Sequence, residues 1–194
     1  MIAGIGCIME TMAKYTEPKI RTYGFETRYD LCLCEFTLDL SRISLSDLKW
    51  YDGDSQGVPF EVVFTAFSDE RTCRLSLVLP NGRHSAVLEY MQHVYPQNAA
   101  MDTRLTAPVE LLYFFGPHFA DRFGIADYTF EALARCDIPL IAAACSGSSI
   151  FLILPENCAR KAKAAFSKLF EVPSRLPDNR RYAPLHPRQA YPGE

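Results

Sequence analysis

Short runs of apolar residues in the first half of the chain predict mainly strands. Val87, then Tyr90 or Met91, and Val94 recur at helical spacing, so residues 83–94 are expected to form a helix. A shorter helix is expected over residues 41–51, where the apolar residues form a loose stripe. Extended segments are expected at residues 20–25, 30–40, 60–67 and 72–80.

The second half shows a clearer alternation of strands and helices. Ile125, Phe130 and Leu133 fall on one side of a helix expected over residues 125–135. A second amphipathic helix, with its basic residues outward, is expected over residues 156–170. Strands are expected at residues 109–116, 139–146 and 149–155.

Each half therefore has the order β-α-β-β-α, with room for a last strand. This is the order of the ferredoxin-like sandwich, so the predicted fold class is α+β, with two βαββαβ sandwiches in tandem. The polar connector at residues 96–108 separates the halves, although residues 102–107 could form one more strand. The expected divisions are a flexible lead-in (1–18), a first domain (19–107), a second domain (108–173) and a disordered tail rich in proline and arginine (174–194).

Composition narrows the class of protein. A hydrophobic fraction of 48%, a formal charge of −3 and a pI near 5.8 indicate a globular protein that does not bind nucleic acid. No apolar run approaches the ~20 residues that span a bilayer, so no membrane partner is expected. The seven cysteines are odd in number and lack a CxxC pair, which favours free thiols and a cytoplasmic location.

The stretch GPHFADRFGIADYTFEAL, residues 116–133, is the strongest candidate for a binding site. A strand ends at Gly116, a charged loop follows, and a helix begins after Gly124. The unpaired N–H groups at a helix start suit a carboxylate, and a glycine lets a ligand approach the backbone. The N–H groups of Gly124, Ile125 and Ala126 are the expected donors. With no further glycines and no lysine, the loop does not fit a nucleotide.

The second half resembles an ACT domain, most closely the last ACT domain of the aspartokinases. The family pattern is a strand ending in glycine, a loop like D-R-P-G-V-A and a helix like I-F-E-A-L-A. The matching segments follow without gaps over about sixty residues: Gly116, Asp121–Ala126, Phe130–Ala134, Ile138–Pro139, Ala144–Ser146 and Pro155–Glu156. The first half has the same element order without the glycine loop, which suggests a degenerate ACT-like partner. No kinase domain accompanies them.

The resemblance implies a non-catalytic, allosteric regulatory protein that binds a free amino acid where two ACT domains meet, in a homodimer. Pro139 and Gly147 replace an amide and a carboxylate common in the family, which favours a neutral or apolar amino acid over lysine. Asp121 could contact the ammonium group or cap the helix. No cofactor or metal is expected. The expected contact residues are Phe119, Ala120, Asp121, Phe123, Gly124, Ile125, Ala126, Ile138, Pro139 and Ser146.

Other functions have less support from the residues. His118 and Asp121 lack a third metal ligand at suitable spacing. Cys145–Ser149 has no His–Asp arrangement for acyl transfer. The same element order occurs in RNA-binding modules, but the aromatic and basic residues that these need are missing. The main alternative is a structural module that docks on a partner enzyme and carries a vestigial pocket.

Overall fold

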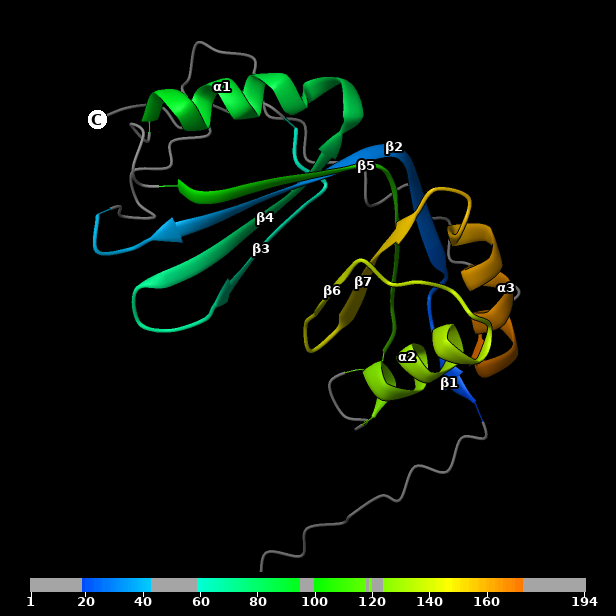
Figure 1. The fold of residues 1–194 in the computed structure, drawn as a ribbon. Coiled ribbons are helices and arrows are strands. Elements are labelled where there is room, and N and C mark those ends of the chain that lie inside the picture. Colours follow the sequence, from blue (N-terminus) through cyan, green and yellow to red (C-terminus); the bar gives the residue numbers. More distant parts are fainter. Residues whose placement is uncertain (1–18, 43–58, 95–99, 118, 120–123, 173–194) are drawn as a thin grey trace, which may run out of the picture.

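The computed structural model describes residues 19–42, 59–94, 100–117, 119 and 124–172. Eight strands, three α-helices and one 3₁₀-helix are formed in this part of the chain (Figure 1). The helices are η2 (Asn81–Arg83), α1 (His84–Val94), α2 (Ile125–Arg135) and α3 (Ala159–Leu169). The strands are β1 (Ile20–Arg21), β2 (Phe25–Asp39), β3 (Val62–Phe67), β4 (Thr72–Pro80), β5 (Ala100–Phe115), β6 (Ala142–Cys145), β7 (Ser149–Pro155) and β8 (Phe170–Glu171).

Six strands form one antiparallel sheet in the order β3-β4-β2-β5-β7-β6. The two central strands, of 15 and 16 residues, are long enough to serve both halves of the molecule. At one end Phe25 pairs with Phe114, and at the other end Thr37 pairs with Asp102. The short strands β1 and β8 form a separate parallel pair.

Two bulges lie at the middle of the central strands. Between the pairs Arg28–Leu111 and Leu31–Val109, β2 advances three residues while β5 advances two. Between Leu31–Val109 and Leu33–Thr106, β5 advances three residues while β2 advances two. At the middle each strand therefore carries one extra residue, and the second bulge restores the pairing register. Bulges bend and twist a strand, and Figure 1 shows both strands turning here.

The bulges keep both apolar layers on the same side of the sheet. Phe25 faces the helices α2 and α3, and on a regular strand Leu31 would face that way too. Instead Cys32 and Cys34 face the helix α1, while Leu31 belongs to a cluster on the opposite face. Because one inserted residue exchanges the two faces of a strand, the helices of both halves can cover one side.

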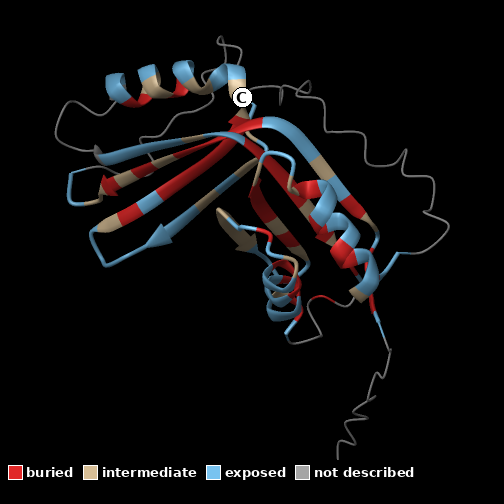
Figure 2. Ribbon diagram, turned by 45° about the vertical axis from the view of Figure 1, so that its right-hand side comes forward, coloured by how far each residue is buried: buried red, intermediate tan, exposed pale blue. Residues whose placement is uncertain are grey.

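The α-helices formed by the described residues all cover this side. Under α1 lie Cys32, Cys34, Phe36, Leu38, Leu75, Leu77, Leu79, Val87 and Met91. Under α2 and α3 lie residues that include Leu112, Phe114, Ile125, Leu133, Ile150, Leu152, Leu154, Phe166 and Phe170. The helix-free face lines the inner side of the bend, and buried positions there come from both halves (Figures 1 and 2).

The two halves interlock. Ile20 and Phe25 belong to the core under α2 and α3, and the ring of Phe25 lies 5.2 Å from that of Phe114. The boundary expected between residues 107 and 108 lies inside β5, where Pro108, which has no N–H group, occupies the bulge. The division into domains stays a prediction, and the lead-in 1–18 and the tail 174–194 lie outside the described residues.

The mixed helix and strand content is confirmed, and so is the helix over residues 125–135. The extended segments 20–25 and 30–40 were wrong in detail, since one strand runs from Phe25 to Asp39. The alternative given for the connector 96–108, one more strand over residues 102–107, is confirmed, because β5 begins at Ala100. The helix expected at residues 41–51 lies mostly outside the described residues.

The bulge in β2 contains Asp30, which has a left-handed φ of 53°. Asp30→Val is expected to lower the free energy of unfolding by about 1–2 kcal/mol, because a β-branched residue is strained there. Asp30→Gly should not lower it. Urea denaturation measures both. Glu26→Val, an equally exposed change at a regular pair of the same strand, should cost little; an equal loss would contradict this account of the bulge.

Candidate functional site

The loop between β5 and α2 starts at a close approach of two chain segments. A Cβ atom on Gly116 would collide with the carbonyl oxygen of Arg21 and would lie 2.5 Å from the Phe119 ring. The Phe119 side chain is only 8% exposed, and its ring packs edge-on against Phe114 at 5.8 Å. Phe119 therefore anchors the loop to the core. Ala120, Asp121 and Phe123 lie outside the described residues.

Gly124 ends the loop and caps α2. Its φ of 85° is left-handed, and its carbonyl oxygen accepts a hydrogen bond from the Tyr128 N–H at 2.9 Å. No side chain in the described part of the chain caps α2. The first N–H groups of a helix have no partner within it, so those at Ile125 and Ala126 can serve a ligand. The Ile125 side chain is buried in the core and Ala126 packs against the core, so these two residues can contact a ligand only through their backbone N–H groups.

Ser146 lies at the same end of the sheet as this loop. Phe115, the last residue of β5, pairs with Ser149, so the β6–β7 turn lies beside the loop start. The Ser146 hydroxyl oxygen accepts hydrogen bonds from the N–H groups of Ser149 at 3.0 Å and Ser148 at 3.3 Å. Its first role is to hold the turn.

Ile138 and Pro139 lie at the other end of α2. The Ile138 N–H donates to the Leu133 carbonyl at 3.0 Å, and the Ile138 side chain is 5% exposed. A helix of 11 residues, roughly 16 Å long, separates them from Gly124. Within one chain the structure brings Ser146 to the loop, and it does not bring Ile138 or Pro139 there.

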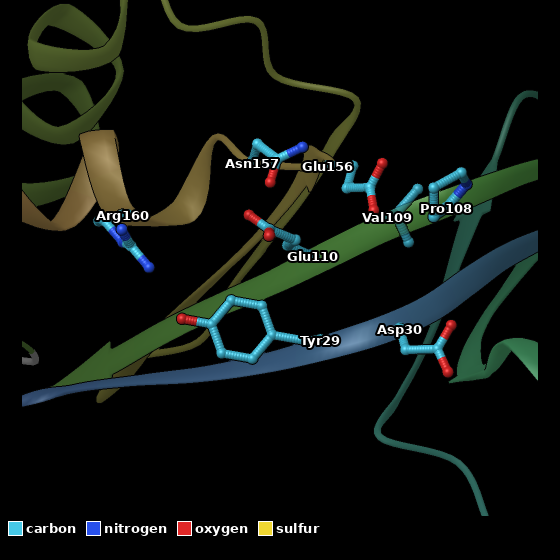
Figure 3. A pocket seen from close by; sticks show the side chains of 8 residues that line it. All are labelled: Tyr29, Asp30, Pro108, Val109, Glu110, Glu156, Asn157 and Arg160. Carbon is cyan, nitrogen blue, oxygen red and sulfur yellow. The ribbon is translucent and has the colours of Figure 1, made fainter.

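A cavity that the sequence did not indicate lies beside the bulge, at the start of α3 (Figure 3). It measures about 490 Å³, and Tyr29, Asp30, Glu110, Asn157 and Arg160 are among its lining residues. Glu110 is 5% exposed, and its carboxylate accepts a hydrogen bond from the Ala159 N–H at 2.7 Å. This carboxylate caps α3, which has no cap from its own side chains.

A second cavity, of about 410 Å³, lies on the helix-free face inside the bend. Four charged side chains line its floor: Glu35, Arg74, Asp102 and Arg104. Leu140 and Ile141, from the segment that leads into β6, line it as well. The residues come from both halves of the chain, so no local sequence pattern could indicate this cavity.

No protein-family model matches the sequence, and no curated protein matches it. Solved structures match in fold. The ligand-free regulatory subunit of aspartate kinase from Thermus thermophilus matches with a TM-score of 0.64 and 15% identity, over 77% of this chain and 99% of that one. The regulatory subunit from Thermus flavus gives 0.62 and 14%, over 77% and 98%.

The chain has the fold of an aspartate kinase regulatory subunit. The resemblance read from the sequence is therefore confirmed at the level of the fold. A whole aspartate kinase, that of Clostridium acetobutylicum, which is described as an allosteric enzyme, matches with a TM-score of 0.61 and 17% identity. The match covers 81% of this chain and 37% of that enzyme.

The cysteines in the described part of this aspartate-kinase-type fold include a pair of buried thiols, Cys32 and Cys34. All six cysteines in the described residues are free. Burial and the neighbouring Cys32 raise the pKa of Cys34 to about 12, so its thiol stays neutral at physiological pH. Within the described residues no group of three His, Cys, Asp or Glu side chains is placed to hold a metal ion. None of the helices described is long and apolar enough to cross a membrane.

The close approach at the loop start can be tested through stability. Gly116→Ala is expected to lower the free energy of unfolding by about 1–3 kcal/mol, because the added methyl group collides with backbone and ring atoms. Chemical denaturation measures the loss. At Gly82 an added Cβ meets nothing within 4 Å, so Gly82→Ala should change stability by less than about 0.5 kcal/mol. Similar losses at both positions would argue against the close approach.

The Glu110 cap gives a second prediction. Glu110→Gln keeps the shape of the side chain but removes the charge at the start of α3, which should cost about 1–2 kcal/mol of stability. Thermal or urea unfolding measures it. Glu156→Gln removes an exposed carboxylate from the same cavity and should cost much less; if the two variants are equally stable, Glu110 does not act as the cap.

Proposed function

We propose that this chain is a non-catalytic regulatory protein that binds a free amino acid between two ACT-type units. The observation that carries the proposal is the β5–Gly116–loop–Gly124–α2 unit. It presents helix N–H groups that no side chain of the described residues caps, next to a left-handed glycine, in a chain that has the fold of an aspartate kinase regulatory subunit. A carboxylate is the group that such a helix start favours.

The two ACT-type units of the proposal are interlocked. The N-terminal half of β2 completes the sheet of the unit that contains α2 and α3. The N-terminal half of β5 completes the sheet of the unit that contains α1. Each unit thereby has four strands, and each depends on a strand that continues into the other.

A second copy of the chain completes the proposed site. Gly124 and Ile138 lie at opposite ends of α2. A small ligand can therefore contact both positions only where Gly124 of one unit lies next to Ile138 of another. Ile138 and Ile125 side chains are buried in the core, which leaves backbone groups as their contribution. Gly147 offers no carboxylate to pair with a basic side chain, and this favours a neutral or apolar amino acid over lysine. The proposed assembly is a homodimer.

Thermal unfolding in the presence of each of the twenty amino acids tests the proposal. At about 100 times Kd a ligand stabilises the folded protein by about 2.7 kcal/mol, which should raise Tm by roughly 5–10 °C. If no amino acid raises Tm at millimolar concentration while a partner enzyme co-purifies, the chain is the docking module with a vestigial pocket instead.

Loop variants locate the binding. Gly124→Val and Asp121→Ala are expected to abolish the rise in Tm that the ligand causes, because they alter the loop that holds the carboxylate and ammonium groups. Gly82→Val places the same side chain in open space and should keep the full rise. Retention of the rise in both loop variants would place the amino acid elsewhere.

A further inference from the structure

The helix-free face carries two rows of polar side chains across strands β4, β2 and β5. In one row Thr37 lies between Arg74 and Asp102, and in the next Glu35 pairs with Arg104. Neighbouring strands are about 4.8 Å apart, so the floor of the cavity spans roughly 10 Å from β4 to β5. Two positive and two negative groups are thus fixed on a rigid sheet at the scale of a small molecule.

The four charged side chains are available to pair with a small polar ligand. Among the described residues none of the four side chains takes part in an ion pair or a hydrogen bond with another side chain. Glu35 is half-buried, while the other three are exposed. The cavity of about 410 Å³ falls within the usual range for small-molecule sites, about 300–1,000 Å³.

The apolar wall comes from the other half of the chain. Leu140 and Ile141 border the cavity, and the Ile141 N–H donates to the Ile153 carbonyl at 2.9 Å, which ties this segment to β7. Leu140 is 38% exposed, so its side chain has apolar surface left to cover. The bend divides the sheet into two arms: β3, β4 and the adjoining halves of β2 and β5 under α1, and β6, β7 and the other halves of β2 and β5 under α2 and α3. A ligand in this cavity touches both arms.

We propose that this cavity binds a free α-amino acid with an aliphatic side chain, at a site distinct from the loop at Gly124. Arg74 and Arg104 bind the carboxylate, Glu35 and Asp102 bind the ammonium group, and Leu140 and Ile141 cover the side chain. The two carboxylates disfavour a phosphate ligand, and the two guanidinium groups disfavour a simple cation, so a zwitterion fits the charges best. This cavity site rests on the proposed regulatory function in one respect only, the choice of a free amino acid as the ligand.

Binding at this site stabilises the bend angle at which the floor and the wall of the cavity both contact the ligand. The floor belongs to strands β2, β4 and β5 of the arm under α1, and the wall belongs to the segment between α2 and β6. A ligand that contacts both holds them together across the bulges. The site therefore links amino-acid binding to the shape of the whole regulatory fold.

Titration of the ¹⁵N-labelled full chain with L-valine, L-leucine and L-isoleucine tests the site. The amides of Thr37, Thr106 and Ile141 are expected to shift on binding. Arg74→Gln and Arg104→Gln should each weaken binding about tenfold or more, as loss of a charged hydrogen bond does. Arg83→Gln removes an exposed arginine outside the cavity and should leave Kd unchanged. Isobutylamine and 3-methylbutanoate, which each lack one charge of valine, should bind at least tenfold more weakly.

The outcomes separate this site from the loop. Shifts confined to Gly124, Ile125 and Ala126, with Kd unchanged in both arginine variants, would overturn the cavity site and leave the proposed function in place. Shifts confined to the cavity would support it and remove the loop site. No binding of the three aliphatic amino acids would overturn the cavity site, whereas the proposed function falls only if all twenty fail.

Discussion

The two opposed bulges in β2 and β5 are the constraint on which the rest of the structure depends. The central strands are shared lengthwise, so each must turn an apolar face first toward one helix layer and then toward the other. Strand side chains alternate strictly, and only an inserted residue can exchange the faces midway. One insertion in each strand does this while it preserves their pairing beyond the bend.

The bend that follows from the bulges creates the surfaces where ligands could act. Because the three α-helices of the described residues lie on one side, the other side of the sheet lines the inner angle. Charged residues of one arm and apolar residues of the other meet there. At the bulge itself, Glu110 from β5 reaches the start of α3 and fixes that helix to the sheet.

Interlocking also determines how movement passes between the two halves of the chain. Neither half can close its sheet without a strand that continues into the other half, so movement of one arm is transmitted through covalent strands. The same fold covers nearly the whole length of two separate aspartate kinase regulatory subunits. The loop at Gly124 lies at the far end of one arm and the charged cavity lies at the bend, so ligands at the two sites would act on the same pair of strands.

Local patterns in the sequence determined the helix at residues 125–135, the end of the strand before Gly116 and the left-handed glycine before α2. Each of these depends on neighbours within a few residues, since helical period and glycine dihedrals are local properties. The sharing of β2 and β5, the capping of Ala159 by Glu110 and the meeting of Glu35 with Arg104 were decided only by the tertiary structure. These contacts join residues some 50 to 90 positions apart. The register of β2 on β5 depends on two single-residue bulges that leave no periodic signal in the sequence.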